Sequence, residues 1–239
     1  MTVAAPFAWV GEHLIIDLPG GRALFSTRRG GVSEGACTSL NLGRWTDDDP
    51  GAIARNYKRL AGAVGLRVDA LAQARQVHGT RVLHREAGGV AEEEADGVAV
   101  TAPGLAALVL TADCLPVALV APGAVAMVHA GWRGLDGGVL EAGVAALAGA
   151  GPIRAAIGPG AGRCCYEVGP ELHERFGTVG PTLDLKGMAR ERLLAAGVEE
   201  VHDAGLCTIC TERDGMPVFF SHRRDAGRTG RQAGVVWRS

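Results

Sequence analysis

The feature that most constrains the fold is an apolar segment between residues 97 and 130 that glycine and proline repeatedly interrupt. Its apolar runs are broken too often to supply the roughly 20 helical residues that span a membrane. Short apolar runs bounded by turn residues are typical of buried strands. We therefore predict strands over residues 105–112, 115–120 and 124–129, and we expect no membrane partner.

Strand and helix patterns follow one another irregularly in the rest of the chain. Helices are predicted where apolar residues recur at helical spacing or where a run of helix formers ends on glycine, at 50–65, 139–151 and 187–196. Strands are predicted at 22–27, 153–157 and 217–220, and a turn at 131–138. Because no regular β-α-β alternation joins these elements, the pattern favours an α+β fold. No linker, charge block or repeat divides the chain, so we predict a single domain over residues 1–239.

Charge and missing motifs exclude several classes of protein. The 24 Lys and Arg residues against 26 Asp and Glu leave a net charge of −2, so we expect no nucleic-acid partner. The chain contains no phosphate-binding loop, dinucleotide fingerprint, G-x-S-x-G elbow or zinc nucleobase deaminase motif. The N-terminal segment has no secretory signal pattern, and we expect a cytoplasmic location. In that compartment the six cysteines are expected to be thiols, metal ligands or a nucleophile.

Three residues at strand ends or in turns carry metal-ligand chemistry: His78 in RQVHGT, Cys114 in TADCLPV and His129 in AMVHAGWRG. Taken singly, each is explained as an ordinary turn or core residue. Together, two imidazoles and one thiolate are ligands that suit Zn²⁺, and three protein ligands leave a fourth position for water or substrate. Their spacing matches no short zinc motif, so the prediction depends on the fold bringing them together.

The same residues suit a mechanism without metal. Cys114 as nucleophile and His129 as base would form the site of a thiol hydrolase, because a nearby imidazole lowers the pKa of a thiol. A third alternative is an interaction protein whose metal is only structural.

The other cysteines are a weaker candidate for a metal site. Cys207 and Cys210 form a C-x-x-C pair, but Cys164 and Cys165 are adjacent and cannot mirror that spacing. A structural site on four cysteines is therefore disfavoured.

The sequence GWRG at residues 131–134 is a candidate phosphate site. Glycines let backbone N–H groups approach an anion, a helix start adds positive partial charge, and Arg133 supplies a guanidinium fork. A tight turn with Trp132 packed in the core explains the same residues. Further cations are offered by Arg28, in STRRGG, and by Arg223, Arg224 and Arg228, in SHRRDAGRTGRQ, although surface arginines are usually solvated.

Two carboxylates lie close in sequence to these motifs. Asp113 precedes Cys114, and Glu167 lies in YEVG. Ligating imidazoles usually donate their second N–H to a carboxylate or carbonyl, so either residue is a candidate for orienting a ligand or for acid–base chemistry.

A series of motifs resembles one known family. FSTRRGGVSEG, TSLNLG, QVHGTRV, EADGVAV, TADCLPV, VHAGWRGL, AAIGPGAG with YEVG, and SHRRDAGRTGRQA occur in this order from about residue 24 to the end of the chain. They resemble the YfiH family, also described as laccase-domain polyphenol oxidases or peptidoglycan editing factor. The resemblance implies a single αββα-type sandwich, similar in its core to a toxin cysteine hydrolase. It places the family's metal ligands on His78, Cys114 and His129.

The resemblance also implies an activity. It points to a zinc-dependent purine nucleoside phosphorylase that splits adenosine, inosine and methylthioadenosine with phosphate, with an associated adenosine deaminase activity. It leaves open a hydrolase or amidase that edits peptidoglycan precursors with Cys114 as nucleophile. Copper-dependent phenol oxidation is disfavoured, because seven histidines in the whole chain are few for several copper sites.

For phosphorolysis we expect a defined division of roles. Arg28 and Arg133 are expected to bind phosphate, and Asn41, in SLNL, to bind the sugar hydroxyls. Asp113 joins Cys114 and His129 as the expected catalytic residues.

Overall fold

A computed structural model describes residues 3–238, which form two large mixed sheets packed face to face. Sheet 1 runs in the order β1 (Ala8–Val10), β2 (His13–Leu18), β3 (Gly21–Phe25), β15 (Gln232–Trp237), β8 (Ala106–Thr111), β4 (Leu71–Arg75) and β6 (Gly89–Glu94). Sheet 2 runs β12 (Glu200–Asp203), β11 (Arg154–Ile157), β9 (Leu115–Val120), β10 (Val125–Ala130), β7 (Gly97–Val100) and β5 (Val82–Arg85). A small hairpin joins β13 (Glu212–Arg213) to β14 (Met216–Pro217).

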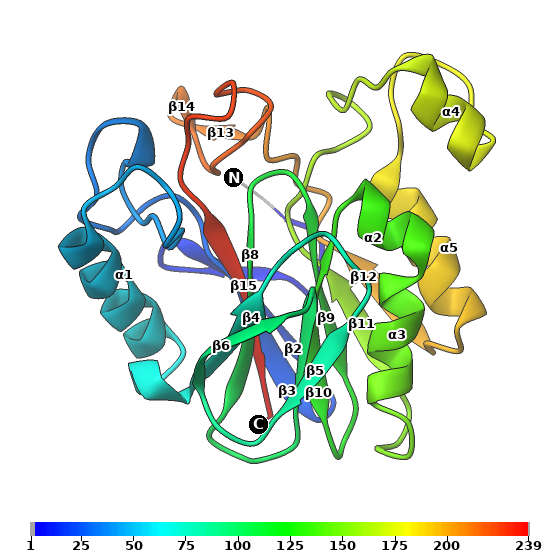
Figure 1. Ribbon diagram of the computed structural model, residues 1–239, viewed down its shortest axis with the longest axis horizontal. Helices are drawn as coiled ribbons and strands as arrows, with labels where there is room; N and C mark the ends of the chain where they lie inside the picture. The colour runs from blue at the N-terminus through cyan, green and yellow to red at the C-terminus, as the bar shows by residue number, and fades with distance from the viewer. Residues whose placement is uncertain (1–2, 239) are drawn as a thin grey trace.

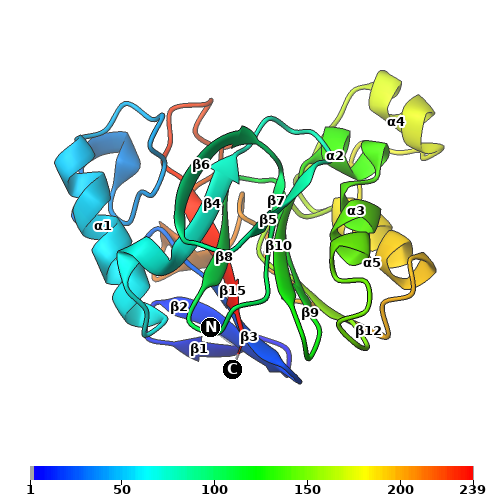
Figure 2. The same ribbon diagram turned by 60° about the horizontal axis from the view of Figure 1, so that its bottom comes forward.

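Helices cover the outer faces of both sheets. Figure 1 shows α1 (Pro50–Ala63) on the side of sheet 1, and α2 (Trp132–Gly137), α3 (Val139–Ala146) and α5 (Leu185–Ala195) on the side of sheet 2. The same layers are seen in Figure 2, with α4 (Pro170–Phe176) at their margin. Short 3₁₀ turns occupy Gly35–Cys37 and Val68–Ala70. The α+β fold predicted from the sequence is confirmed, and its layers are helix, sheet, sheet, helix.

The core between the sheets is apolar. Phe25 of β3 and Val109 of β8 pack from sheet 1 against Met127 of β10 and Val120 of β9 from sheet 2. Burial of such side chains is the main force that holds two sheets together, at about 25 cal/mol per Å² of apolar surface.

Helix α1 begins and packs as its sequence dictates. Asp49 caps it by accepting from the N–H groups of Gly51 and Ala52, and Pro50 takes the first turn, where no N–H is needed. Ile53 and Leu60 lie on its buried face against sheet 1. The helix predicted over 50–65 is confirmed.

The interrupted apolar segment forms the centre of the fold. The predicted strands over 105–112, 115–120 and 124–129 correspond to β8, β9 and β10, and every residue of these three strands is buried. Strand β8 lies in sheet 1, and β9 and β10 lie side by side in sheet 2. The segment therefore crosses from one sheet to the other between Thr111 and Leu115.

Two predicted elements differ from the structure. Residues 131–138 were predicted to be a turn, but they form α2, which begins after Gly131 and ends at Gly138, whose left-handed φ of 94° separates α2 from α3. Residues 217–220 were predicted to be a strand, but only Pro217 belongs to one. The side-chain amide of Gln232 bonds to both the N–H and the carbonyl of Phe220, and so takes the place of a neighbouring strand.

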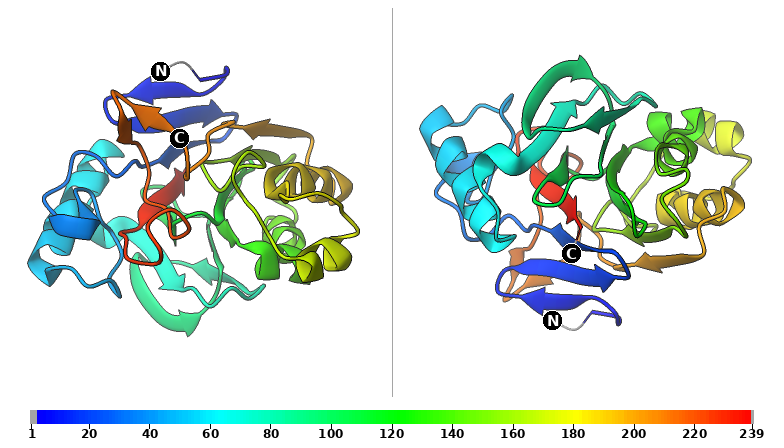
Figure 3. Two further views of the ribbon diagram at one scale, coloured as in Figure 1. Left: turned by 90° about the horizontal axis from the view of Figure 1, so that it is seen from above. Right: turned by 90° about the horizontal axis from the view of Figure 1, so that it is seen from below.

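Three connections between the sheets gather at one end of the sandwich. Residues 76–81, 95–96 and 112–114 each leave a strand of sheet 1 and enter a strand of sheet 2. Strand β10 ends and β15 begins at this same end, since Ala130 pairs with Leu115 and Gln232 with Thr111. Figure 3 shows β15, in red, near the middle of the molecule. Within residues 3–238, no helix is both long enough and apolar enough to span a bilayer.

Candidate functional site

The fold brings His78, Cys114 and His129 together, and we call this group the three-donor site. Their ligand atoms all lie within 4.8 Å of one another. The Sγ of Cys114 is 3.9 Å from Nε2 of His78, and the two imidazole rings meet edge to face at 4.8 Å between centroids. His78 and Cys114 lie on two connections between the sheets and His129 lies near the end of β10, so the fold brings together donors that are 36 and 15 residues apart in sequence.

A buried carboxylate shapes the turn that carries His78. The N–H groups of Val77, His78 and Gly79 donate to the two oxygens of Asp96 at 3.1, 2.9 and 2.6 Å. His78 has a φ of 61°, which few residues other than glycine adopt. Such strain persists only where neighbouring groups enforce it, and here Asp96 supplies the enforcing bonds.

Asp96 also orients His129. Its Oδ1 lies 2.7 Å from Nδ1 of His129, and both side chains are buried. Burial opposes ionisation of Asp96, but His129 and the N–H groups of the turn outweigh it and lower the pKa of this carboxyl. Since Nδ1 is engaged, Nε2 is left for the centre of the site.

Sequence reasoning missed Asp96 and selected Asp113 and Glu167 for this orienting role. The one sequence cue for Asp96 is its place in EADGVAV, immediately before an apolar strand. Its partners lie 17 to 33 residues away, so only the fold identifies them.

Cys114 and His129 alter each other's protonation. Burial alone would raise the pKa of Cys114, but the charge and hydrogen bond of His129, with a further contribution from His78, lower it to about 6. Burial alone would lower the pKa of His129, but Cys114 and Asp96 raise it to about 9. In the absence of a metal, the pair therefore favours thiolate and imidazolium at neutral pH.

The absence of a side chain at Gly131 leaves space for the donor side chains of Cys114 and His78. A Cβ atom at this position would lie 2.8 Å from Sγ of Cys114 and 3.1 Å from Cδ2 of His78. The backbone of the GWRG segment therefore passes against the donors in a way that only glycine permits.

Asp113 lies beside the three-donor site but bonds away from it. Its buried carboxylate accepts from Thr208 Oγ1 at 2.6 Å, from Ser221 Oγ at 3.1 Å and from the N–H of Arg223 at 2.7 Å. It also has a positive φ, of 90°. The structure thus places Asp113 where three separate loops meet. Glu167 is exposed, and its backbone carbonyl accepts from Arg223 Nη1.

The three-donor site opens into a cavity of about 530 Å³, a size typical of small-molecule sites. Three arginines line it: Arg133 of α2, and Arg223 and Arg231 from the segment that leads into β15. Aromatic residues and polar groups complete the lining, among them Trp45, Trp132, Tyr166, Gln76 and His222. The cavity therefore combines flat apolar surfaces with positive charge.

The structure does not bring Arg28 and Asn41 to this lining. Nε of Arg28 donates to the carbonyl of Thr38, and its guanidinium lies over the ring of Phe220 at 4.8 Å. Asn41 is buried and bonds to the Thr46 and Asp48 side chains and to backbone N–H groups. Arg133 does line the cavity, and its guanidinium stacks on Trp132 at 4.2 Å.

Arg231 is not among the residues considered from the sequence, and Arg223 is there one of several arginines expected mostly to be solvated. Burial lowers the pKa of Arg231, whereas the nearby thiols Cys114 and Cys37 act in the opposite direction. Both arginines lie in SHRRDAGRTGRQ, a sequence rich in arginine, where residue type alone does not separate cavity residues from solvated ones.

A second cluster corrects an expectation from the sequence. Cys164, Cys165, Cys207 and Cys210 lie with all four sulfurs within 4.8 Å of one another. The adjacency of Cys164 and Cys165 was expected to prevent this. A tight turn, closed by the bond from Cys165 N–H to the carbonyl of Gly162, lets the two neighbouring side chains face the C-x-x-C pair.

Comparison with known proteins identifies the family of this chain. Residues 22–239 match the family model described as multi-copper polyphenol oxidoreductase laccase. The chain is 39% identical to a purine nucleoside phosphorylase of Deinococcus radiodurans, over 89% of this chain and 87% of that protein. It is 39% identical to purine nucleoside phosphorylase YfiH of Escherichia coli K12, over 90% of this chain and 93% of that one. The crystal structure of YlmD from Geobacillus stearothermophilus is similar with a TM-score of 0.87 and 31% identity, over 97% of this chain and 98% of that one. The chain therefore belongs to the laccase-like polyphenol oxidoreductase family that includes YfiH.

Proposed function

We propose that this protein is a zinc-dependent purine nucleoside phosphorylase with an associated adenosine deaminase activity. The observation that carries the proposal is the meeting of His78, Cys114 and His129 beside a cavity lined by three arginines. The curated relatives from D. radiodurans and E. coli are named purine nucleoside phosphorylases, which supports the same reaction here.

The donor set fits a zinc ion. Two imidazole nitrogens and one sulfur are ligands that zinc prefers, and the cavity offers space for a fourth ligand from water or substrate. When bound, such an ion polarises a substrate oxygen or lowers the pKa of a water. Within residues 3–238 this is the one metal-compatible cluster that contains histidine, which argues against the several copper sites of a laccase.

The cavity lining suits a nucleoside and a phosphate. Arg133, Arg223 and Arg231 supply guanidinium groups that match the oxygens of phosphate. Trp45, Trp132 and Tyr166 offer rings on which a purine can stack. Burial, and then the negative charge of Cys114, raise the pKa of Tyr166, so its hydroxyl keeps its proton and remains a hydrogen-bond donor.

The proposed phosphorolysis exchanges one bond at the sugar. A phosphate oxygen bonds to C1′ of the ribose as the bond from C1′ to N9 breaks, and the departing purine takes up a proton on a ring nitrogen. The arginines hold the phosphate close to C1′ and offset its charge, which is the kind of positioning that dominates phosphate chemistry. In deamination, a water oxygen bonds to C6 of adenosine and ammonia leaves.

Product analysis tests the proposal. Inosine is incubated with the purified protein with and without phosphate, and products are separated by chromatography. If hypoxanthine and ribose 1-phosphate form only when phosphate is present, the result supports phosphorolysis. Adenosine without phosphate is the test for deamination, with inosine and ammonia as the expected products. No reaction of either nucleoside overturns the proposal.

A second candidate is a thiol hydrolase acting on peptidoglycan precursors. It is favoured by one observation: Cys114, His129 and Asp96 stand in the order of nucleophile, base and orienting carboxylate. The thiol hydrolase would be established if metal-free protein cleaves an amide bond in a precursor peptide and its intact mass shows an acyl group on Cys114. Loss of all activity on metal removal rules it out.

We also propose a cytoplasmic location. None of the six cysteines is in a disulfide, and reduced thiols suit a compartment that keeps them so. Alkylation of the thiols in unlysed cells, followed by mass spectrometry, tests whether they are reduced there.

A further inference from the structure

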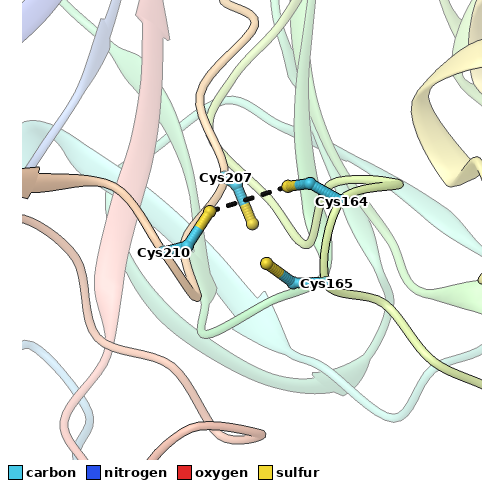
Figure 4. Close-up of side chains that lie close together, drawn as sticks. All are labelled: Cys164, Cys165, Cys207 and Cys210. Atoms are coloured by element: carbon cyan, nitrogen blue, oxygen red, sulfur yellow. Dashed lines mark hydrogen bonds between the residues drawn. The ribbon is translucent and has the colours of Figure 1, made fainter.

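The four-cysteine cluster (Cys164, Cys165, Cys207 and Cys210) lies outside the three-donor site and has no part in the proposed reaction. Two cysteines come from the loop after β11 and two from the loop after β12. Figure 4 shows the four side chains pointing into one space. Strands β11 and β12 are parallel neighbours, so their following loops leave the sheet at the same end.

The spacing of the sulfurs matches a single tetrahedral ion. Four sulfurs at about 2.3 Å from a zinc ion lie about 3.8 Å from one another along the edges of the tetrahedron. Here Sγ of Cys164 and Sγ of Cys210 are 3.6 Å apart, and all four sulfurs lie within 4.8 Å. All four cysteines are free thiols, and a disulfide would need sulfurs about 2 Å apart. A four-iron cluster needs more room, because its cysteines bind the corners of a cube.

The backbone around the cluster is built for close approach of the sulfurs. The N–H of Gly162 donates to Sγ of Cys207 at 3.3 Å, a bond typical of thiolate sites. A Cβ atom on Gly162 would lie 3.1 Å from Cβ of Cys207 and 3.2 Å from Sγ of Cys164. The bond from Thr208 N–H to the carbonyl of Gly160 fastens the two loops together. The loops therefore hold the thiols in one place without help from a disulfide.

From this geometry we propose that Cys164, Cys165, Cys207 and Cys210 bind a structural Zn²⁺. Four protein ligands close the coordination shell, which is the pattern of structural rather than catalytic zinc. On binding, each thiol releases its proton to solvent and supplies a sulfur–zinc bond. Cys164 and Cys210 are exposed, so an ion can enter from solvent.

The proposed zinc would stabilise two loops that contact residues of the cavity. Thr208, inside the C-x-x-C pair, donates to the carboxylate of Asp113, and the N–H of Ala161 donates to the Asp113 carbonyl at 2.7 Å. Asp113 immediately precedes Cys114, and Tyr166, which follows Cys165, lines the cavity. An ion joining the two loops therefore fixes the backbone next to Cys114 and the position of Tyr166 at the cavity.

Metal content of purified variants tests the proposal. The double variant Cys164→Ala with Cys210→Ala is compared with Cys37→Ala, which removes a cysteine outside both clusters. Each is purified in reducing buffer, and zinc per chain is measured by plasma mass spectrometry. We expect the double variant to lose one zinc per chain and the Cys37→Ala protein to lose none.

A second measurement separates this site from the three-donor site and does not depend on the double variant folding. In a Cys114→Ala background, Co²⁺ is added to the metal-free protein with the four cysteines intact. Strong sulfur-to-cobalt absorption, with the visible bands of tetrahedral cobalt, supports the proposal whatever reaction the enzyme performs. Weak absorption, equal zinc content in the double variant and the control, or bound iron would overturn it. So would an intact mass that is two hydrogens lower for each disulfide.

Discussion

The three-donor site and the four-cysteine cluster lie at the same end of the sandwich but are built differently. In the first, donors of two kinds come from connections between the sheets and from the end of β10, and they face a cavity of about 530 Å³. In the second, four sulfurs come from two neighbouring loops and face one another. An open site with mixed donors leaves room for a reaction, whereas a closed sulfur site leaves room only for an ion. This difference is the basis for proposing a reaction at the three-donor site and a structural role for the four-cysteine cluster.

The largest expected effect is on activity when a donor of the open site is removed. His129→Ala removes one of three donors and leaves Asp96 without its side-chain partner. Changes to groups that only orient a ligand cost about 10–100-fold, so loss of a ligand itself should lower kcat/KM for inosine phosphorolysis by more than about 100-fold. Steady-state kinetics below the unfolding temperature measures this. His84→Ala, an exposed histidine of β5, is the matched control, and a His129→Ala enzyme within tenfold of it would contradict the prediction.

The next effect distinguishes the two proposed metal sites by their surroundings. Asp96→Asn keeps the size of the side chain but removes the charge that holds His129 and the 77–79 turn. We expect a decrease of about 10–100-fold in activity and in metal affinity at the three-donor site. Titration with a chelator measures that affinity. Metal on the four-cysteine cluster should be retained, and loss of both metals together would show that the sites are not independent.

A smaller effect is expected for phosphate binding. Arg133→Ala removes one guanidinium from the cavity without touching a donor. A hydrogen bond to a charged group contributes about 1.5–3 kcal/mol, so KM for phosphate should rise by about tenfold or more while zinc content stays the same. Initial rates at varied phosphate concentration measure this, with Arg85→Ala of β5 as the control. An unchanged phosphate KM removes Arg133 from this role.

The smallest effect on activity is expected at the closed cluster. The variant Cys164→Ala with Cys210→Ala should keep kcat/KM within about tenfold, because neither residue lines the cavity. Its unfolding temperature should fall by several degrees, since 1 kcal/mol corresponds to about 2–4 °C in a domain of 150–250 residues. Differential scanning calorimetry, with Cys37→Ala beside it, measures the shift. An activity loss as large as that of His129→Ala would break the proposed separation of roles.

The sequence predicted the parts of the molecule that depend on local pattern. The strands β8, β9 and β10 follow from apolar runs and their breakers, and α1 follows from apolar residues at helical spacing. The helix that begins in GWRG was not predicted because it is short and rich in glycine, with Gly131 and Gly138 at its two ends, and the 217–220 strand failed because one glutamine side chain replaces a strand.

The groups that support the site depend on long-range contacts. Asp96 bonds to His129 across 33 residues, and Asp113 bonds to Thr208 across 95. No pattern within a window of sequence contains both members of such a pair. The four-cysteine cluster was rejected on spacing for the same reason, since its two halves meet only when β11 and β12 pair.

The position of β15 has a consequence for how the molecule forms. This strand lies between β3 and β8, so sheet 1 has no continuous hydrogen bonding until residues 232–237 insert between partners more than 100 residues earlier. Pairing over such separations slows folding, and the segment just before β15 carries Arg223 and Arg231. We expect the cavity that Arg223 and Arg231 line to be among the last regions to gain protection in pulse-labelled refolding. A chain arrested before this insertion should lack both a complete sheet 1 and enzymatic activity.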